Sequence, residues 1–271
     1  MANAIDIRNF SFRYGSASAS ALSDVSLSIV RGSCCALLGA SKSGKSTLLH
    51  ACSGSLGRIV SQFTAKGEIE ILGTLHAPMP ATILFPQVAL AHQEASLMLS
   101  GMYETVREEL QLTLDSLESD ERSVLQRIQW VLRLLGVEQL AERNPVTLSG
   151  GELHKVAIGT VLVSQPPILL LDEPTVGLDQ HSQFELARII RTLSSTLTVV
   201  FSEATIDLAL LCAERIAVLN WGRIQFQGNR EEFLNRLDEF EDTLPTRTWT
   251  DIRAAASRTD SHRLKRILQL Q

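Results

Sequence analysis

The first ninety residues alternate short apolar runs with turn residues. Runs at residues 5–7, 21–29, 34–38 and 67–72 are rich in isoleucine, valine, leucine or cysteine and predict strands, as does a shorter run at 82–85. The run at 34–38 is apolar at every position, which is typical of a strand that is covered on both faces.

The middle of the chain has a helical period instead. Between about residues 105 and 140, charges are frequent and glycine is rare. Five apolar residues there fall on one helical face: Val124, Ile128, Val131, Leu132 and Leu135. Asp120 and Glu121 suit the N-terminus of this helix, and Gly136 suits its end.

Strand and helix patterns alternate again after Gly150. Runs at 168–171, 198–201 and 216–219 predict strands with helices between them, which indicates a mainly parallel α/β sheet with a helical insertion. In the last forty residues, four apolar positions with 4-3-4 spacing predict a helix that Pro245 ends: Phe233, Leu237, Phe240 and Leu244.

Composition narrows the class of protein. Of 271 residues, 45% are apolar and 20% are charged, which excludes a disordered chain. The net charge of −5 disfavours a nucleic-acid partner. The four cysteines lack metal-site spacing and are expected to be buried thiols. Because no apolar run reaches the ~20 residues of a membrane span, we expect a cytosolic chain, or one attached to a membrane through another protein.

The segment Gly39–Thr47 matches the pattern G-x(4)-G-K-[ST], between the apolar run at 34–38 and a helix predicted from Lys45. Successive backbone N–H groups and the helix N-terminus form an anion site. Lys45 is expected to bridge the β- and γ-phosphates of a nucleoside triphosphate, and the Ser46 hydroxyl to bind Mg²⁺. The predicted nucleotide contacts are Gly39, Ala40, Ser41, Lys42, Ser43, Gly44, Lys45, Ser46 and Thr47. We expect the Lys42 side chain to be solvated rather than a further phosphate-binding cation.

A second motif, Leu148-Ser-Gly-Gly-Glu152, begins another predicted helix. Ser149 and Glu152 have the spacing of a capping box. The adjacent Gly150 and Gly151 also allow the backbone to approach an anionic ligand closely. A capping role and a ligand-binding role are therefore both predicted.

Asp172 and Glu173 directly follow the apolar run at 168–171. Their carboxylates are therefore expected at the carboxyl edge of the sheet, where ligands bind in open α/β folds. Asp172 is predicted to hold Mg²⁺ through water, and Glu173 to polarise the attacking water molecule.

These motifs, together with Gly177-Leu-Asp179, occur in the order and spacing of ATP-binding cassette (ABC) ATPases. Over roughly residues 3–230 the chain resembles this family. The resemblance implies a P-loop NTPase fold with a RecA-like parallel sheet, an antiparallel β subdomain and a helical subdomain at about 95–150. We also expect a C-terminal helical extension at 231–271. ATP and Mg²⁺ are the implied cofactors.

The resemblance also implies roles for single residues. Tyr14 is similar to the aromatic residue that stacks on adenine, with an ordinary strand tyrosine as the alternative. Asp179 resembles a loop residue that crosses the dimer interface. Gln93 matches the spacing of the glutamine that links Mg²⁺ to the helical subdomain better than Gln87 does. In this family the segment Ser149–Glu152 of one subunit covers the ATP of another, which implies a homodimer or heterodimer around two ATP molecules.

Three classes of protein carry a phosphate-binding loop of this kind. An NTPase outside the family is disfavoured by the motifs at 148–152 and 177–179. A soluble ABC-type ATPase is the alternative that stays open, although one acidic cassette without a coiled-coil insertion disfavours it. We expect the ATPase subunit of a transporter, peripheral at the cytoplasmic face of the membrane on an integral membrane subunit.

Within transporters, residues 10–15, 105–109 and 206–209 most resemble the ATPases of energy-coupling-factor importers, which take up vitamins or transition-metal ions; residues 244–247 resemble their C-terminal extension. The membrane subunit is expected to dock after Gln93, unless the apolar residues there belong to the core: Leu97, Met98, Leu99 and Met102. The basic segment 253–266 is expected to be a solvated helix face rather than a lipid contact.

One position departs from the family pattern. After the run at 198–201, ABC ATPases usually carry a histidine that contacts the γ-phosphate. Alignment puts Ala204 there, or Glu203 after a one-residue slip, and neither is a charged donor. We therefore predict slow hydrolysis at this chain's own site, unless the alignment is wrong and His154 or His181 serves instead.

Overall fold

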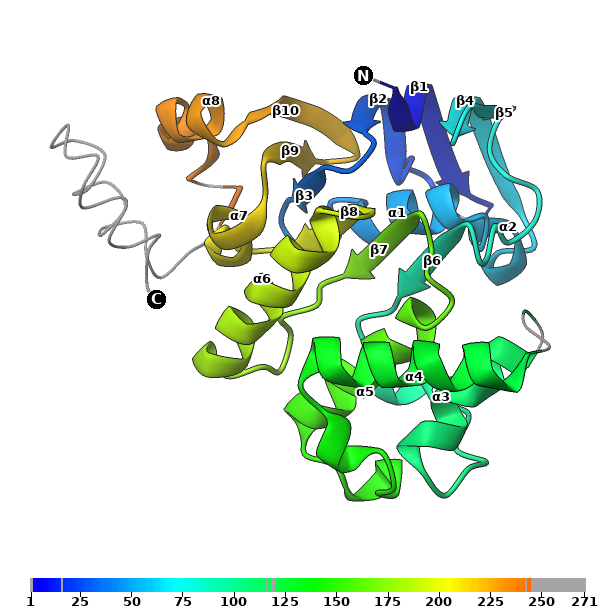
Figure 1. Ribbon diagram of the computed structural model, residues 1–271. Helices are drawn as coiled ribbons and strands as arrows, with labels where there is room; N and C mark the ends of the chain where they lie inside the picture. Colours follow the sequence, from blue (N-terminus) through cyan, green and yellow to red (C-terminus); the bar gives the residue numbers. More distant parts are fainter. Residues whose placement is uncertain (1, 16, 116, 118–119, 242, 245–271) are drawn as a thin grey trace, which may run out of the picture.

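The computed structural model describes residues 2–15, 17–115, 117, 120–241 and 243–244, and it contains two sheets and a layer of helices (Figure 1). The strands are β1 (Asn3–Tyr14), β2 (Leu22–Val30), β3 (Cys34–Leu38), β4 (Phe63–Ile71), β5 (Thr74–His76), β6 (Val88–Ala91), β7 (Ile168–Asp172), β8 (Thr198–Glu203), β9 (Arg215–Asn220) and β10 (Arg223–Asn229). The α-helices are α1 (Lys45–Ser53), α2 (Leu56–Ile59), α3 (Val106–Asp115), α4 (Glu121–Leu135), α5 (Gly150–Leu162), α6 (Gln180–Ser194), α7 (Asp207–Cys212) and α8 (Arg230–Asn235). Four short 3₁₀ helices are η1 (Ala95–Met98), η2 (Glu138–Leu140), η3 (Pro145–Thr147) and η4 (Leu237–Phe240).

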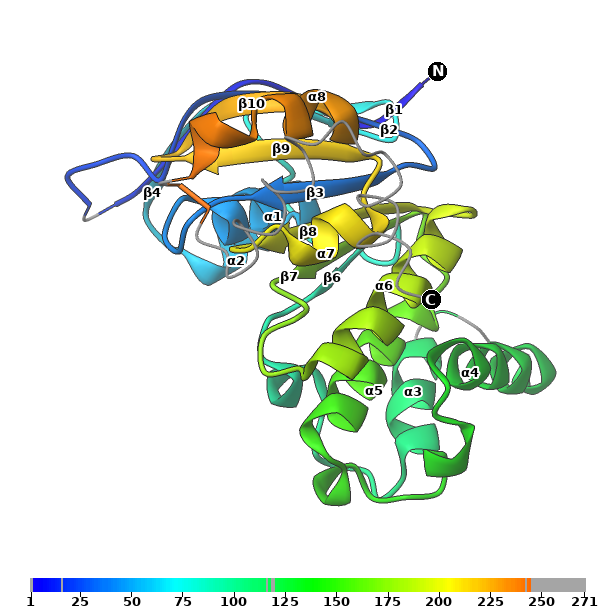
Figure 2. The ribbon, with the colours of Figure 1, turned by 90° about the vertical axis from the view of Figure 1, so that its left-hand side faces the viewer.

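The larger sheet has six strands in the order β10-β9-β3-β8-β7-β6. Its five strands from β9 to β6 are parallel, and β10 pairs with β9 antiparallel at one edge. The smaller sheet is antiparallel, in the order β2-β1-β4-β5. Figure 2 shows β1 and β2 of the smaller sheet above β3, β8, β7 and β6 of the larger one, and the helices α3, α4 and α5 below both sheets. This arrangement confirms the predicted α/β fold class, with its antiparallel part and its helical insertion.

Two hydrophobic cores flank the six-stranded sheet, and β3 contributes to both. Cys35 and Leu37 pack with the antiparallel sheet and α1, whereas Cys34, Ala36 and Leu38 pack on the opposite face with α6 and α7. Successive side chains of a strand point to opposite faces, so a strand buried on both faces must be apolar throughout. All four cysteines are buried free thiols, as expected.

The helical layer follows the predicted pattern. The five apolar residues on one face of α4 are all buried. The Asp120 side chain accepts a hydrogen bond from the Ser123 N–H, and Gly136 ends the helix in a left-handed conformation. Among the described residues, no helix combines the length and the apolar character that crossing a bilayer requires. The basic segment 253–266 and residues 245–247 lie outside the described residues.

Two sequence predictions are wrong. Residues 82–85 do not form a strand; the edge strand is β6, three residues further on, beyond a cis peptide bond between Phe85 and Pro86. The 4-3-4 apolar spacing near the C-terminus does not form one helix, because α8 ends before Arg236 and η4 follows. The four apolar residues are nevertheless buried, since Phe233 and Phe240 pack with Phe226 of β10.

Candidate nucleotide-binding site

The loop between β3 and α1 can be built only with glycine at two positions. A Cβ atom on Gly39 would lie 2.2 Å from the Leu219 carbonyl oxygen and 2.6 Å from Ser43 Oγ. Gly44 has φ of +108°, and a Cβ there would lie 2.7 Å from the Ala21 carbonyl oxygen. The backbone therefore curves tightly, with β2 and β9 packed against its outer side.

Lys45, the first residue of α1, lies at the centre of this loop. Its side chain is 3% exposed, and its ammonium group donates hydrogen bonds to the carbonyl oxygens of Gly39 (2.8 Å) and Ala40 (3.1 Å). The same group lies 3.2 Å from Glu173 Oε1. A buried cation is thus held by two backbone dipoles and one carboxylate, all of which an anion in the loop can replace.

Ser46 and Asp172 meet at the edge of the sheet. Ser46 Oγ donates a hydrogen bond to Asp172 Oδ1 at 3.1 Å, and Ser202 Oγ donates to the same oxygen at 2.6 Å. Asp172 ends β7 and Ser202 is its register partner in β8, which explains why the two side chains converge. A hydroxyl and a carboxylate are the oxygen ligands that Mg²⁺ prefers.

Glu173 follows with an unusual backbone. Its φ of +45° is in the left-handed region, which a non-glycine residue rarely adopts without support from its surroundings. Its N–H donates to Ser202 Oγ at 2.9 Å, so β8 holds the turn that aims the Glu173 carboxylate at Lys45.

The residues predicted from the family resemblance lie in different places around this centre. The Tyr14 hydroxyl is 2.9 Å from Thr47 Oγ1 of α1. Gln93 follows the carboxyl end of β6, and Asp172 lies at the carboxyl end of the neighbouring parallel strand β7. Gln87 precedes β6 and therefore lies at the opposite, amino ends of these strands. The ring of His92 stacks on His50 of α1 with centroids 5.2 Å apart, which places the loop that carries Gln93 beside α1.

Ser149 and Asp179 are the N-caps of α5 and α6, whose N-termini contact each other. Ser149 and Glu152 form a complete capping box on α5, and Asp179 accepts from the Ser182 N–H at the start of α6. A Cβ on Gly151 would lie 3.3 Å from Ser182 Oγ, so the two helix N-termini are neighbours. The segment Ser149–Glu152 lies in the helical layer, apart from the phosphate-binding loop at the sheet (Figure 1).

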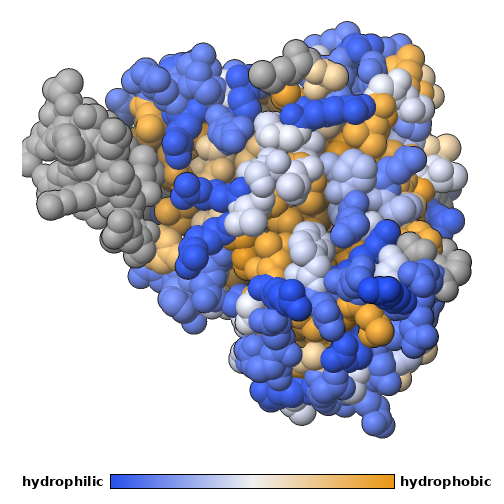
Figure 3. Space-filling view, viewed as in Figure 1, coloured by the Kyte–Doolittle hydropathy of each residue, from blue (hydrophilic) through white to orange (hydrophobic). Residues whose placement is uncertain are grey.

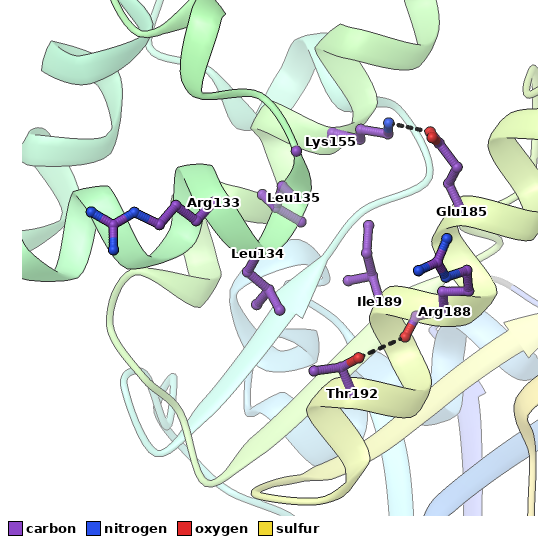
Figure 4. Close-up of a pocket in the computed structure, with 9 residues that line it drawn as sticks. Arg133, Leu134, Leu135, Lys155, Glu185, Arg188, Ile189 and Thr192 are labelled. Atoms are coloured by element: carbon purple, nitrogen blue, oxygen red, sulfur yellow. Dashed lines mark hydrogen bonds and ion pairs between the residues drawn. The ribbon is translucent and has the colours of Figure 1, made fainter.

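A separate cavity of about 270 Å³ lies between α4, α5 and α6 (Figure 4). Lys155 and Glu185 both line it, and the ion pair between them joins α5 to α6. Figure 3 shows apolar residues gathered in the middle of this face, between the sheets and the helical layer. None of the predicted nucleotide contacts lines this cavity.

Sequence reasoning missed the part that the end of β8 plays. The predicted strand stopped at Phe201, but β8 continues to Glu203, and Ser202 contacts both Asp172 and Glu173. The parallel pairing of β7 with β8 is the signal that identifies these residues, and it is visible only in the fold. Ala204 directly follows β8. His154 is buried on α5 and His181 is exposed on α6.

The residues at the centre fit a nucleoside triphosphate with Mg²⁺. Ser43 Oγ is a buried side-chain oxygen that lacks a hydrogen-bond partner among the described residues, at the inner bend of the loop. Together with the glycine cradle, the Lys45 ammonium and the paired oxygens of Ser46 and Asp172, it provides donors for phosphate and ligands for a hard cation.

Comparison with known proteins gives consistent matches. Residues 22–176 match the family model described as ABC transporter. A protein of Pyrococcus abyssi named as an ABC transporter ATP-binding protein is 33% identical over 242 residues, which cover 88% of this chain and 85% of that protein. A Pyrococcus horikoshii protein of the same name is 33% identical over 252 residues, with coverage of 90% and 87%.

Solved structures share the fold. The structure of CbiO1 from Clostridium perfringens, described as part of the ABC transporter complex CbiONQ, has a TM-score of 0.74 at 24% identity and covers 89% of this chain and 94% of that one. A nucleotide-free ATP-binding cassette from an ABC transporter has a TM-score of 0.72 at 22% identity, with coverage of 88% and 96%.

Proposed function

The chain belongs to the family of ABC transporter ATP-binding proteins, and on this premise we propose that it is the ATP-hydrolysing subunit of an energy-coupling-factor importer. The observation that carries the proposal is the convergence of Lys45, Ser46, Asp172 and Glu173 at one edge of the sheet. Phosphoryl transfer needs a cation for the phosphates, ligands for Mg²⁺ and a group that orients water, and these four residues supply them.

Each residue has a defined part in the proposed reaction. Ser46, Asp172 and Gln93 would hold Mg²⁺, which when bound would supply positive charge to neutralise that of the phosphates. Lys45 exchanges the carbonyl oxygens of Gly39 and Ala40 for phosphate oxygens. The Glu173 carboxylate, released from Lys45, accepts a hydrogen bond from the attacking water and orients it. The ring of Tyr14, next to Thr47, stacks on the adenine.

The rate of this reaction is proposed to be low at the chain's own site. Ala204 occupies the place that directly follows β8 and has no polar side chain. The neighbouring Glu203 side chain turns to the Thr175 N–H instead. The chain therefore either works slowly as a homodimer or pairs with a second, different ATPase subunit.

In one chain the segment Ser149–Glu152 lies away from the phosphate-binding loop, so we propose that a complete ATP site needs two chains. The segment Ser149–Glu152 begins α5 in the helical layer, so we propose that it covers ATP bound to the phosphate-binding loop of a second subunit. Asp179, which caps the neighbouring helix α6, is proposed to cross the same interface. Two ATP molecules then lie between two cassettes.

The membrane partner is proposed to dock on the helical layer. Leu97 and Met102 are 73% and 74% exposed, whereas Met98 and Leu99 pack partly against the core. Met102 also lines an apolar cavity of about 480 Å³ with Val146 and Leu148. An exposed apolar patch of this kind suits an apolar helix of an integral membrane subunit, which would hold the chain at the cytoplasmic face of the membrane.

The importer class is supported by two features. The segments at 10–15 and 105–109 resemble those of energy-coupling-factor ATPases. The second is the shared fold with CbiO1, which is described as part of the ABC transporter complex CbiONQ. On this basis the cargo is a vitamin or a transition-metal ion.

Purification of the tagged chain from native membranes tests the proposal. We expect a polytopic membrane protein to co-purify, either with one ATPase or with a second one, and the complex to hydrolyse ATP. Co-purification with ribosomes or DNA in place of a membrane protein would instead identify a soluble ABC-type ATPase.

A further inference from the structure

Glu203 is a buried carboxylate whose position in the fold the family motifs do not explain. It is the last residue of β8 and is 3% exposed. Its Oε1 accepts a hydrogen bond from the Thr175 N–H at 3.0 Å, and its main-chain oxygen accepts from the Gly39 N–H at 3.2 Å. One residue thus joins the start of the phosphate-binding loop to the segment that follows Glu173.

The segment that follows β7 needs such support. Glu173 has left-handed φ, and the chain turns sharply there before Pro174. The turn is held at both ends by β8, because Ser202 accepts the Glu173 N–H and Glu203 accepts the Thr175 N–H. We call these two side chains the β8 clasp.

The ion pair with Lys45 does not provide the same support during turnover. Lys45 is the proposed phosphate-binding cation, so its contact with Glu173 is lost when phosphates take its place. Neither residue of the β8 clasp belongs to the phosphate-binding loop. The clasp can therefore hold Glu173 in position after Lys45 has turned to the nucleotide.

We propose that Glu203 is a positioning residue for Glu173: its carboxylate fixes the backbone at Thr175 and thereby the direction of the Glu173 carboxylate. The inference rests on the proposed hydrolysis of ATP at Glu173. Burial, and secondarily the charge of Glu173, raise the pKa of Glu203 to about 7. A neutral Glu203 keeps Oε1 as an acceptor, so the clasp does not require the charge.

The test compares two variants of nearly equal size in the full chain. Glu203→Gln keeps an acceptor for the Thr175 N–H, whereas Glu203→Met removes it. ATP affinity and single-turnover hydrolysis, followed over hours, are measured in the complex isolated from the cell. We expect Glu203→Met to slow hydrolysis about tenfold or more while the Kd for ATP stays within about threefold. Glu203→Gln is expected to keep the wild-type rate within about threefold.

Three kinetic outcomes would overturn the proposal. Wild-type hydrolysis by Glu203→Met would show that Glu203 positions nothing. A parallel loss of ATP binding would indicate a general structural role. Equal slowing by both variants would show that the charge matters rather than the acceptor.

Amide hydrogen exchange tests whether Glu203 holds the backbone at Thr175 without relying on ATP hydrolysis. In Glu203→Met, residues 173–178 should exchange about tenfold faster, with the rest of the chain unchanged. Unchanged exchange there overturns the clasp, even if no variant hydrolyses ATP. Absence of hydrolysis in the wild-type complex, with faster exchange in Glu203→Met, overturns the proposed function and the positioning role together but leaves the clasp itself in place.

Discussion

Ser46 Oγ donates a hydrogen bond to Asp172 Oδ1 at 3.1 Å, although 126 residues separate the two in the sequence. The contact joins the first turn of α1 to the end of β7 and brings together two proposed ligands of one Mg²⁺ ion. The residues around this contact are therefore the ones whose substitution tests the binding and hydrolysis of ATP.

Lys45→Ala should weaken ATP binding at least tenfold. The substitution removes a buried, charge-assisted donor, and such contacts contribute about 1.5–3 kcal/mol each. Equilibrium binding of a fluorescent ATP analogue measures the loss. Lys42→Ala is the matched comparison, because Lys42 is exposed and its removal should change the affinity only a few-fold. Tight binding by Lys45→Ala would contradict the assignment of the loop.

Glu173→Gln should leave ATP binding intact and stop hydrolysis. Glutamine keeps the shape of the side chain but cannot act as the base. Bound ATP should then persist between two cassettes, and gel filtration at saturating Mg·ATP should show a stable dimer. A variant that remains monomeric with all partners present would count against the sandwich.

Ala204→His should raise ATP turnover in the assembled complex. A transition-state donor of this kind contributes about a hundred- to thousandfold in rate, and the present side chain offers none. Steady-state phosphate release measures the gain, and Ala204→Leu, which adds bulk without a donor, controls for size. If turnover of a homodimer is already fast and the histidine does not increase it, the slow-site hypothesis is wrong.

Tyr14→Phe and Tyr14→Ala separate stacking from hydrogen bonding. If the ring stacks on adenine, phenylalanine should keep ATP affinity within a few-fold, and alanine should lower it about tenfold. If the hydroxyl contact with Thr47 is what matters, both variants should instead lose affinity equally. Affinities for ATP and for inorganic triphosphate, which lacks the base, distinguish the two.

Glu203→Gln should stabilise the nucleotide-free protein at alkaline pH. Burial raises the pKa of Glu203 to about 7 from an ordinary value of 4.5. The unfolded chain therefore loses this proton at lower pH than the folded protein does. Glu203 therefore contributes fully to the free energy of unfolding below about pH 4.5, where it is neutral in both states. This contribution is lost as the pH rises to about 7.

Glutamine does not titrate, so the variant should gain up to about 3 kcal/mol above pH 7 and little near pH 5. Urea unfolding at pH 5 and pH 8 measures the difference. An equal change in unfolding free energy at both values would contradict the raised pKa.

Local sequence was sufficient for many elements of the fold. The buried strand Cys34–Leu38, the start of α1 at Lys45 and the two ends of α4 lie where the sequence predicts them. These elements are determined by the spacing of apolar residues, by the Asp120 cap and by the Gly136 stop. Each of these signals acts over one or two helical turns, so its free energy comes from residues that are close together in the sequence. Local chemistry also predicts the phosphate-binding loop, because its glycines, Lys45 and Ser46 are close together in the sequence.

Only the tertiary structure decided which distant residues meet. Residues 82–85 and 88–91 are both apolar, and β6 is the run whose backbone pairs with β7. The same pairing puts Gln93, rather than Gln87, at the edge that carries Asp172. Glu203 contacts Thr175 because β8 lies between β3 and β7. The order of the strands depends on hydrogen bonds between segments that are far apart in the sequence. The free energy of these bonds cannot be read from any local pattern of residues.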